Sequence, residues 1–133
     1  MRFTSACVYA LRALAYLARH GGGPVTSHTI AAAEGLSENF LLKALMPLVK
    51  SGVLRSERGP GGGYRLVRPA RSITLLEVVE AVEGLVRGEA PVVGGRGHAR
   101  LDTKLQAVCE GVAELVRRRL GKVRLADLVR EGE

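Results

Sequence analysis

The chain has 133 residues, no tryptophan and a formal net charge of +7, which predicts one small domain, or one domain with an appendage, around an Ala/Leu/Val core. Two distant cysteines exclude a disulfide framework, and no signal-peptide pattern or membrane-length apolar stretch is present, so we expect a cytoplasmic protein without membrane contact. Residues 40–71 hold seven basic side chains against one acid, Glu57, a concentration typical of a nucleic-acid-binding surface.

A first amphipathic helix is predicted over residues 4–20. Its apolar face recurs at alternating spacings of four and three, and consists of Phe3, Cys7, Ala10, Leu14 and Leu17. The run Gly21-Gly22-Gly23-Pro24 then ends this helix, because neither glycines nor proline sustain helical backbone.

Two shorter helices joined by a tight turn are expected next. Thr26 or Ser27 is the candidate N-cap of the first, and Ser37 of the second, which should run from Glu38 to about residue 51. Pro47 inside that helix is expected to bend or weaken it. Its predicted buried residues are Phe40, Leu41, Leu45 and either Leu48 or Val49. Two helices joined in this way match a helix-turn-helix.

A Gly-rich β-hairpin is predicted directly after these helices. Residues 58–63 contain four glycines and a proline between two β-friendly runs, residues 53–57 and 64–67, with arginines at both edges of the tip. A narrow cationic hairpin suits a nucleic-acid groove or a phosphate ligand. No Gly-Lys-Ser/Thr follows the glycines, and a strand rather than a helix comes next, which disfavours a nucleotide site. The hairpin is therefore interpreted as the wing of a winged helix-turn-helix.

A second region, residues 72–133, is expected to hold a linker helix, a Gly-rich loop over residues 88–100 and a long helix near 101–120. Thr74 and Glu77 match a capping box. In the helix behind it we expect Val78, Val79 and Val82 to face inward, and Glu77, Glu80 and Glu83 to face solvent. A short closing helical turn is expected near residues 124–129.

The long helix carries an apolar stripe with the spacing of paired helices. The stripe consists of Leu101, Leu105, Val108, Val112 and Leu115. Packing on its own domain is the alternative, but dimerisation is favoured for a long helix late in a small chain. The predicted fold class is thus mainly α with a small β-hairpin: a winged helix-turn-helix over residues 1–71, followed by a long C-terminal dimerisation helix.

The predicted partner is double-stranded DNA. Glu38, Asn39 and Lys43, with Leu42 beside them, would face the major groove, where Asn reads adenine and Lys contacts guanine or phosphate. Arg58 at the wing tip would enter a minor groove. Arg55, Arg65, Arg68 and Lys50 would hold phosphates. The predicted DNA-binding residues are Ser37, Glu38, Asn39, Lys43, Lys50, Arg55, Arg58, Gly59, Pro60, Gly61, Gly62, Gly63, Tyr64 and Arg65.

No catalytic or metal-ligand spacing is evident, so an enzyme is not expected. His20, His28 and His98 are expected to be solvated, and Cys7 and Cys109 to be small buried hydrophobes. Two alternatives stay open: a thiol- or metal-sensing regulator that uses Cys7, Cys109 or His98, and a winged-helix adaptor for protein partners that has lost DNA binding.

Several segments resemble the Rrf2 family of bacterial winged-helix transcription regulators, the group of IscR, NsrR and CymR. They are residues 1–4, 9–14, 36–41, the wing Arg58-Gly-Pro-Gly-Gly-Gly-Tyr64-Arg65-Leu66, residues 73–84 and 125–129. The resemblance implies a homodimeric regulator, a repressor by expectation, on a palindromic operator. It places the helix near 38–51 in the major groove, the wing in the minor groove and dimer contacts along residues 101–120.

One departure from the family pattern bears on cofactors. Members with an iron–sulfur cluster carry three clustered cysteines in the loop before the dimerisation helix. Here residues 88–100 contain no cysteine, and His98 is the one candidate ligand in the loop. Because thiolates hold such clusters, we expect no iron–sulfur cluster and no other cofactor. The resemblance then implies a partner protein, a small molecule or thiol oxidation as the signal.

Overall fold

The computed structural model of the chain describes residues 1–130. The three N-terminal helices form as predicted: α1 (Ser5–His20), α2 (Ser27–Glu34) and α3 (Glu38–Lys50). Thr4, Thr26 and Ser37 cap them, each hydroxyl accepting a hydrogen bond from the backbone N–H three residues on. α3 continues through Pro47 to Lys50, so this proline does not end the helix.

The buried face of α3 is narrower than predicted. Leu41, Ala44, Leu45 and Leu48 are at most 1% exposed. Phe40 is 38% exposed, so the expectation of a buried Phe40 is wrong. It precedes the buried stripe by one residue, which turns it about 100° around the helix, and its ring meets the Tyr9 ring edge-on at 4.6 Å. Phe3 was likewise expected in the core, but it lies before α1 begins and is 38% exposed.

The hairpin consists of β1 (Leu54–Glu57) and β2 (Gly63–Leu66), paired antiparallel with Arg55 opposite Arg65 and Ser56 opposite Tyr64. Val25, before α2, adds a contact that the sequence did not reveal: its N–H and C=O both bond to Tyr64, at 2.9 and 2.8 Å. Gly63 permits this approach, because a Cβ there would lie 2.4 Å from the Val25 carbonyl oxygen. The base of the wing is thereby fixed to the segment that leads into α2.

The second region begins with a 3₁₀ turn, η1 (Ala70–Ser72), and α4 (Leu75–Glu83), whose Thr74–Glu77 capping box forms as predicted. Val78 and Val79 are buried and Val82 is half-buried. Glu77, Glu80 and Glu83 do not simply face solvent, because each of these carboxylates accepts hydrogen bonds within the chain. Glu83 accepts from the N–H and the hydroxyl of Thr4, at 2.7 and 2.9 Å, which joins the end of α4 to the start of α1.

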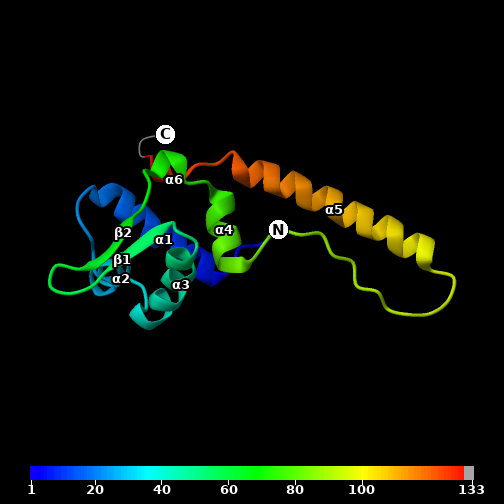
Figure 1. The fold of residues 1–133 in the computed structure, drawn as a ribbon, viewed down its shortest axis with the longest axis horizontal. Helices are drawn as coiled ribbons and strands as arrows, with labels where there is room; N and C mark the ends of the chain where they lie inside the picture. Colours follow the sequence, from blue (N-terminus) through cyan, green and yellow to red (C-terminus); the bar gives the residue numbers. More distant parts are fainter. Residues whose placement is uncertain (131–133) are drawn as a thin grey trace.

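The loop after α4 runs away from the body, and the long helix α5 (Ala99–Gly121) begins at the far end of this arm and returns to the body, where α6 (Leu125–Val129) follows (Figure 1). Ile73, Val78 and Leu125 lie in the same buried cluster as Leu14 and Leu45, so α4 and α6 pack on α1–α3. Within residues 1–130, no helix is both long and apolar enough to span a membrane.

Candidate nucleic-acid interface

The exposed face of α3 is opposite its buried stripe. It carries Asn39, Lys43, Met46 and Lys50, at spacings of four, three and four, which place them on one side of a helix. Asn39, Lys43 and Lys50 were predicted from the sequence, whereas Met46, which is 57% exposed, was not. The large exposed fraction of an apolar residue in line with the predicted contacts is the signal that identifies it. This face offers amide, ammonium and thioether groups to a ligand.

The first residues of α3 hold the helix in place. The hydroxyl of Ser37 caps the helix, and the carboxylate of Glu38 accepts from Ser27 Oγ at 3.2 Å and lies 3.3 Å from His28 Nδ1. His28, on α2, therefore contacts α3 as well as water. These contacts fix the angle between α2 and α3, and they direct Glu38 toward α2 in this structure.

The wing lies beside α3. Met46 and Lys50 of α3, with Ser56 and Tyr64 of the hairpin, line a depression of about 260 Å³ between the two elements. The hairpin projects from the body in Figure 1, and the exposed Arg58 stands at its tip. Gly62 makes this tight tip possible, because a Cβ there would lie 2.2 Å from the carbonyl oxygen of Glu57. The exposed face of α3 and the wing therefore lie side by side, with Lys43 and Lys50 on the helix and Arg58 at the wing tip.

Arg55 and Arg65 lie on the other face of the hairpin. Side chains alternate between the faces of a strand, so Ser56 and Tyr64 turn toward α3 while Arg55 and Arg65 turn away from it. Both guanidinium groups approach the same carboxylate oxygen of Glu57. Arg55 Nε lies 3.8 Å from this oxygen, and Arg65 Nε lies 3.3 Å from it.

Arg68 does not join the basic residues of α3 and the wing. Its guanidinium donates to the Ser72 carbonyl oxygen and to the Glu77 carboxylate, both at 2.8 Å. Partial burial raises the pKa of Glu77, but the hydrogen bonds from Arg68 and the Thr74 backbone, with the charges of Arg68 and Arg124, outweigh it and hold the pKa below its usual value. Arg68 therefore stabilises the segment between β2 and α4 by bonding to Ser72 and Glu77, and it does not lie where it would contact a phosphate.

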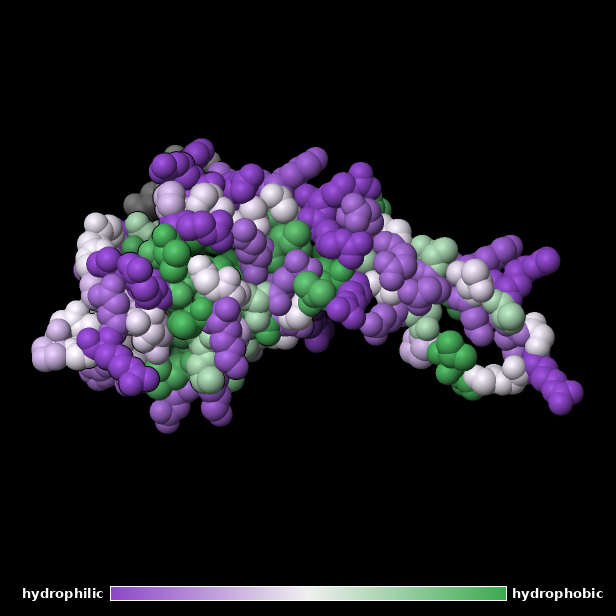
Figure 2. All heavy atoms as spheres, viewed as in Figure 1, coloured by the Kyte–Doolittle hydropathy of each residue, from purple (hydrophilic) through white to green (hydrophobic). Residues whose placement is uncertain are grey.

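The predicted dimerisation stripe is exposed along α5. Leu101, Leu105, Val108, Val112 and Leu115 are between 46% and 62% exposed. Figure 2 shows a further hydrophobic patch on the loop below this arm, where Val92 and Val93 are 78% and 90% exposed. A contiguous apolar stripe on a projecting helix is characteristic of a surface that another chain covers.

The two cysteines lie in different environments. Cys7 is fully buried in α1, and burial, the charge of Glu83 and a hydrogen bond with Glu83 raise the pKa of its thiol to about 11. Cys109 is half-buried on α5, where Gly88 packs so closely that a Cβ on it would lie 2.1 Å from the Cys109 carbonyl oxygen. Gln106 holds the same loop by bonding to Gly88 and Ala90.

Cys7, Cys109 and His98, the candidate ligands of the chain, do not fit an iron–sulfur cluster. The loop that leads into α5 has no cysteine, and Gly88 of this loop packs against the Cys109 backbone. His98 precedes the first turn of α5, and within residues 1–130 no three His, Cys, Asp or Glu side chains gather in a metal-binding group. A cluster needs several thiolates converging at one point, which this arrangement lacks.

Comparisons with known proteins identify the fold and the family. The family model named Rrf2, described as an iron-dependent transcriptional regulator, matches residues 3–131. IscR of Cereibacter sphaeroides is 32% identical over 98% of this chain and 88% of its own, and protein aau3 of Rhizobium meliloti is 46% identical over 62% of this chain and 54% of its own.

Solved structures agree with this match. CymR, the global cysteine regulator of B. subtilis, superposes with a TM-score of 0.76 at 26% identity over 100% of this chain and 99% of its own. IscR of T. potens gives 0.71 at 28% identity over 100% and 89%. The predicted mainly helical fold with a two-stranded wing is thereby confirmed, as is the prediction that the chain is a regulator and not an enzyme. The chain belongs to the Rrf2 family of winged-helix, DNA-binding transcriptional regulators.

Proposed function

We propose that the chain acts as a homodimer that binds a palindromic operator and represses transcription by covering it. In this proposal residues 1–71 bind DNA, and residues 72–133 supply the linker helix, the loop and the dimerisation helix; residues 131–133 lie outside the described structure. The observation that carries it is the joint surface of α3 and the wing, on which Asn39, Lys43, Lys50 and Arg58 are all exposed. A repressor bound to chromosomal DNA would act in the cytoplasm.

α3 would lie in the major groove. The helix is 13 residues long, about 20 Å at 1.5 Å per residue, and the groove is wide enough to admit a helix. Asn39 would read adenine, and Lys43 would contact guanine acceptors or a phosphate. Met46 would lie against a thymine methyl group, because an apolar side chain contacts that group favourably. Ser37 and Glu38 would set the angle of this helix to the DNA.

The wing would enter the neighbouring minor groove with Arg58 leading. A narrow A·T-rich groove concentrates negative potential, which attracts a guanidinium group. The tip residues Gly59, Pro60, Gly61, Gly62 and Gly63 would bring the backbone close to the groove walls. Lys50, Arg55 and Arg65 would contact phosphates, which fixes the register of the complex and strengthens binding without reading bases. Tyr64 would support the wing from the α3 side.

The homodimer would form along the exposed stripe of α5, which runs from Leu101 to Leu115 within the 23-residue helix. Covering the stripe with a second copy would remove this apolar surface from water. A two-fold dimer would then present two copies of α3 to half-sites one helical turn apart, about 34 Å.

We further propose that regulation does not use an iron–sulfur cluster or another resident cofactor. The lack of cysteine in residues 88–100 supports this, and the burial of Cys7 disfavours a thiol sensor built on that residue. A small molecule or a partner protein would then supply the signal.

Selection of random duplexes by the purified protein tests the base-reading roles. We expect a palindromic consensus, a loss of preference at adenine positions for Asn39→Ala, and a loss of preference at A·T-rich positions for Arg58→Ala. Lys50→Ala should weaken binding about equally for all sequences. Unchanged preferences in Asn39→Ala and Arg58→Ala would refute the assigned roles.

A further inference from the structure

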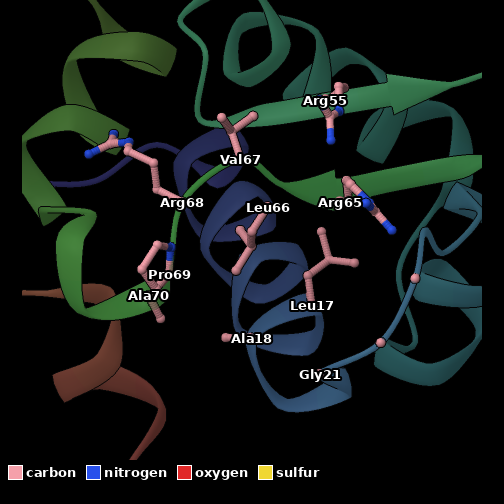
Figure 3. A pocket seen from close by; sticks show the side chains of 12 residues that line it. Leu17, Ala18, Gly21, Arg55, Arg65, Leu66, Val67, Arg68, Pro69 and Ala70 are labelled. Carbon is pink, nitrogen blue, oxygen red and sulfur yellow. The ribbon is translucent and has the colours of Figure 1, made fainter.

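A groove of about 540 Å³ lies on the face of the hairpin that turns away from α3 (Figure 3). The end of α1 and Gly21–Gly23 form one wall, and the hairpin base with the chain to Ala70 forms the other. This volume lies within the range of small-molecule sites, about 300–1,000 Å³.

The hairpin side of the groove carries an excess of positive charge. Arg55 and Arg65 are direct cross-strand partners, and like charges in that position repel each other. Glu57 is their shared acidic neighbour, and one carboxylate oxygen serves both Nε atoms. Arg65 Nε is buried, and its 3.3 Å approach to Glu57 is an ion pair without hydrogen-bond geometry, the one buried side-chain nitrogen or oxygen without a hydrogen bond within residues 1–130. A second oxyanion beside the two guanidinium groups would relieve this repulsion.

The floor of the groove is apolar. Leu17, Ala18, Leu66 and Val67 line it, and Figure 3 shows these side chains beside the two arginines, while the side chain of Arg68 extends away from them. Val67 is 49% exposed at the rim. A DNA phosphate has no apolar part that would cover this floor, whereas a small organic anion has one. Gly21, Gly22 and Gly23 add no side chains, so the backbone wall leaves room for such a body.

We propose that this groove binds a small organic oxyanion, a carboxylate or phosphate with an apolar body. The anionic head lies between the guanidinium groups of Arg55 and Arg65, and the body lies on Leu17, Ala18 and Val67. Because the proposed function gives the same two arginines to DNA phosphates, the bound anion competes with DNA and acts as an inducer. Only this last step rests on the proposed function.

Octanoate is a suitable probe, titrated into the DNA-free protein by calorimetry and by NMR of the arginine Nε–H and glycine amide signals. We expect saturable binding that shifts the signals of Arg55, Arg65 and Gly21–Gly23. Octanamide, which lacks the charge, and inorganic phosphate, which lacks the body, should each bind at least about tenfold more weakly. No saturation, or equal affinity for octanamide or phosphate, would overturn the site.

Variants sharpen the test in both directions. Arg65→Gln and Arg55→Gln should each weaken octanoate binding about tenfold or more, since each removes a charged donor. Glu57→Gln should strengthen it, because the competing internal carboxylate is lost; this gain cannot arise from unfolding. Arg58→Ala, at the tip and outside the groove, should leave octanoate affinity unchanged. Weaker binding in Glu57→Gln, or full affinity in Arg65→Gln, would contradict the proposal.

The coupling to DNA is measured separately. Octanoate at ten times its dissociation constant should raise the apparent dissociation constant for a selected duplex about tenfold, as competition requires. Octanoate binding with unchanged DNA affinity would refute the inducer role and leave the anion site standing. A protein that binds octanoate but no DNA would instead refute the proposed function.

Discussion

Leu115→Ala is expected to weaken the dimer. Leucine to alanine removes three carbons, which amounts to roughly 2.4 kcal/mol of burial at about 0.8 kcal/mol per methylene. Leu115 is 60% exposed, so a partner can cover about that fraction, or roughly 1.4 kcal/mol. A two-fold interface contains the substitution twice, which gives roughly 2.8 kcal/mol and about a hundredfold larger dissociation constant.

The structure also provides a matched control. Leu128 lies on α6 away from the stripe and is 49% exposed, so Leu128→Ala makes the same chemical change off the proposed interface. Alanine favours helix, so α5 should stay helical in Leu115→Ala. Sedimentation equilibrium over a concentration series measures both constants, and far-UV circular dichroism checks the fold. Equal dimer affinity in Leu115→Ala and the wild type, or a wild type that stays monomeric, would refute dimerisation through this stripe.

Three further outcomes follow from the structure. Cys7, with its thiol pKa raised to about 11, should react with a thiol reagent at neutral pH far more slowly than the half-buried Cys109; comparable rates would contradict its burial. The lowered pKa of Glu77 contributes stability that is present above its unfolded pKa and is lost as pH falls through its lower folded pKa. In Glu77→Gln, the melting temperature should therefore fall less steeply as pH is lowered. An unchanged pH dependence of the melting temperature would exclude the Arg68–Glu77 pair as its source. Gly62→Ala should distort the wing, because its Cβ would lie 2.2 Å from the carbonyl oxygen of Glu57, and should therefore weaken specific DNA binding. Gly111→Ala is the control and should leave DNA binding unchanged, because a Cβ there meets nothing within 4 Å. Equal DNA affinity in the two variants would count against the wing contact.

Local signals in the sequence were sufficient for the helices and the hairpin. Hydroxyl caps act over three residues, so Ser37 and Thr74 could be assigned from the sequence, and the cap of α2 could be narrowed to Thr26 or Ser27. Glycine with proline marked the wing tip. The stripe on α5 followed from its period, although periodicity alone does not say whether a partner or the same chain covers an apolar face.

Features that depend on packing between distant segments were not predictable. The bridge from Val25 to Tyr64, the groove at Arg55 and Arg65, and the pairing of Arg68 with Glu77 all arise from how separate elements meet. Arg68 illustrates the difficulty. In the sequence it is one of seven basic residues in a cationic segment, and only its neighbours in space distinguish an internal pair from a phosphate contact.

The most direct test of sequence-specific DNA binding is a fluorescence anisotropy titration of one selected duplex and its scrambled counterpart at two salt concentrations. The joint surface of α3 and the wing predicts a selected site bound about a thousandfold or more tightly than the scrambled one, with specificity that persists as salt weakens both. Equal affinity for the two duplexes, with only a steep salt dependence, would contradict sequence-specific recognition by this surface.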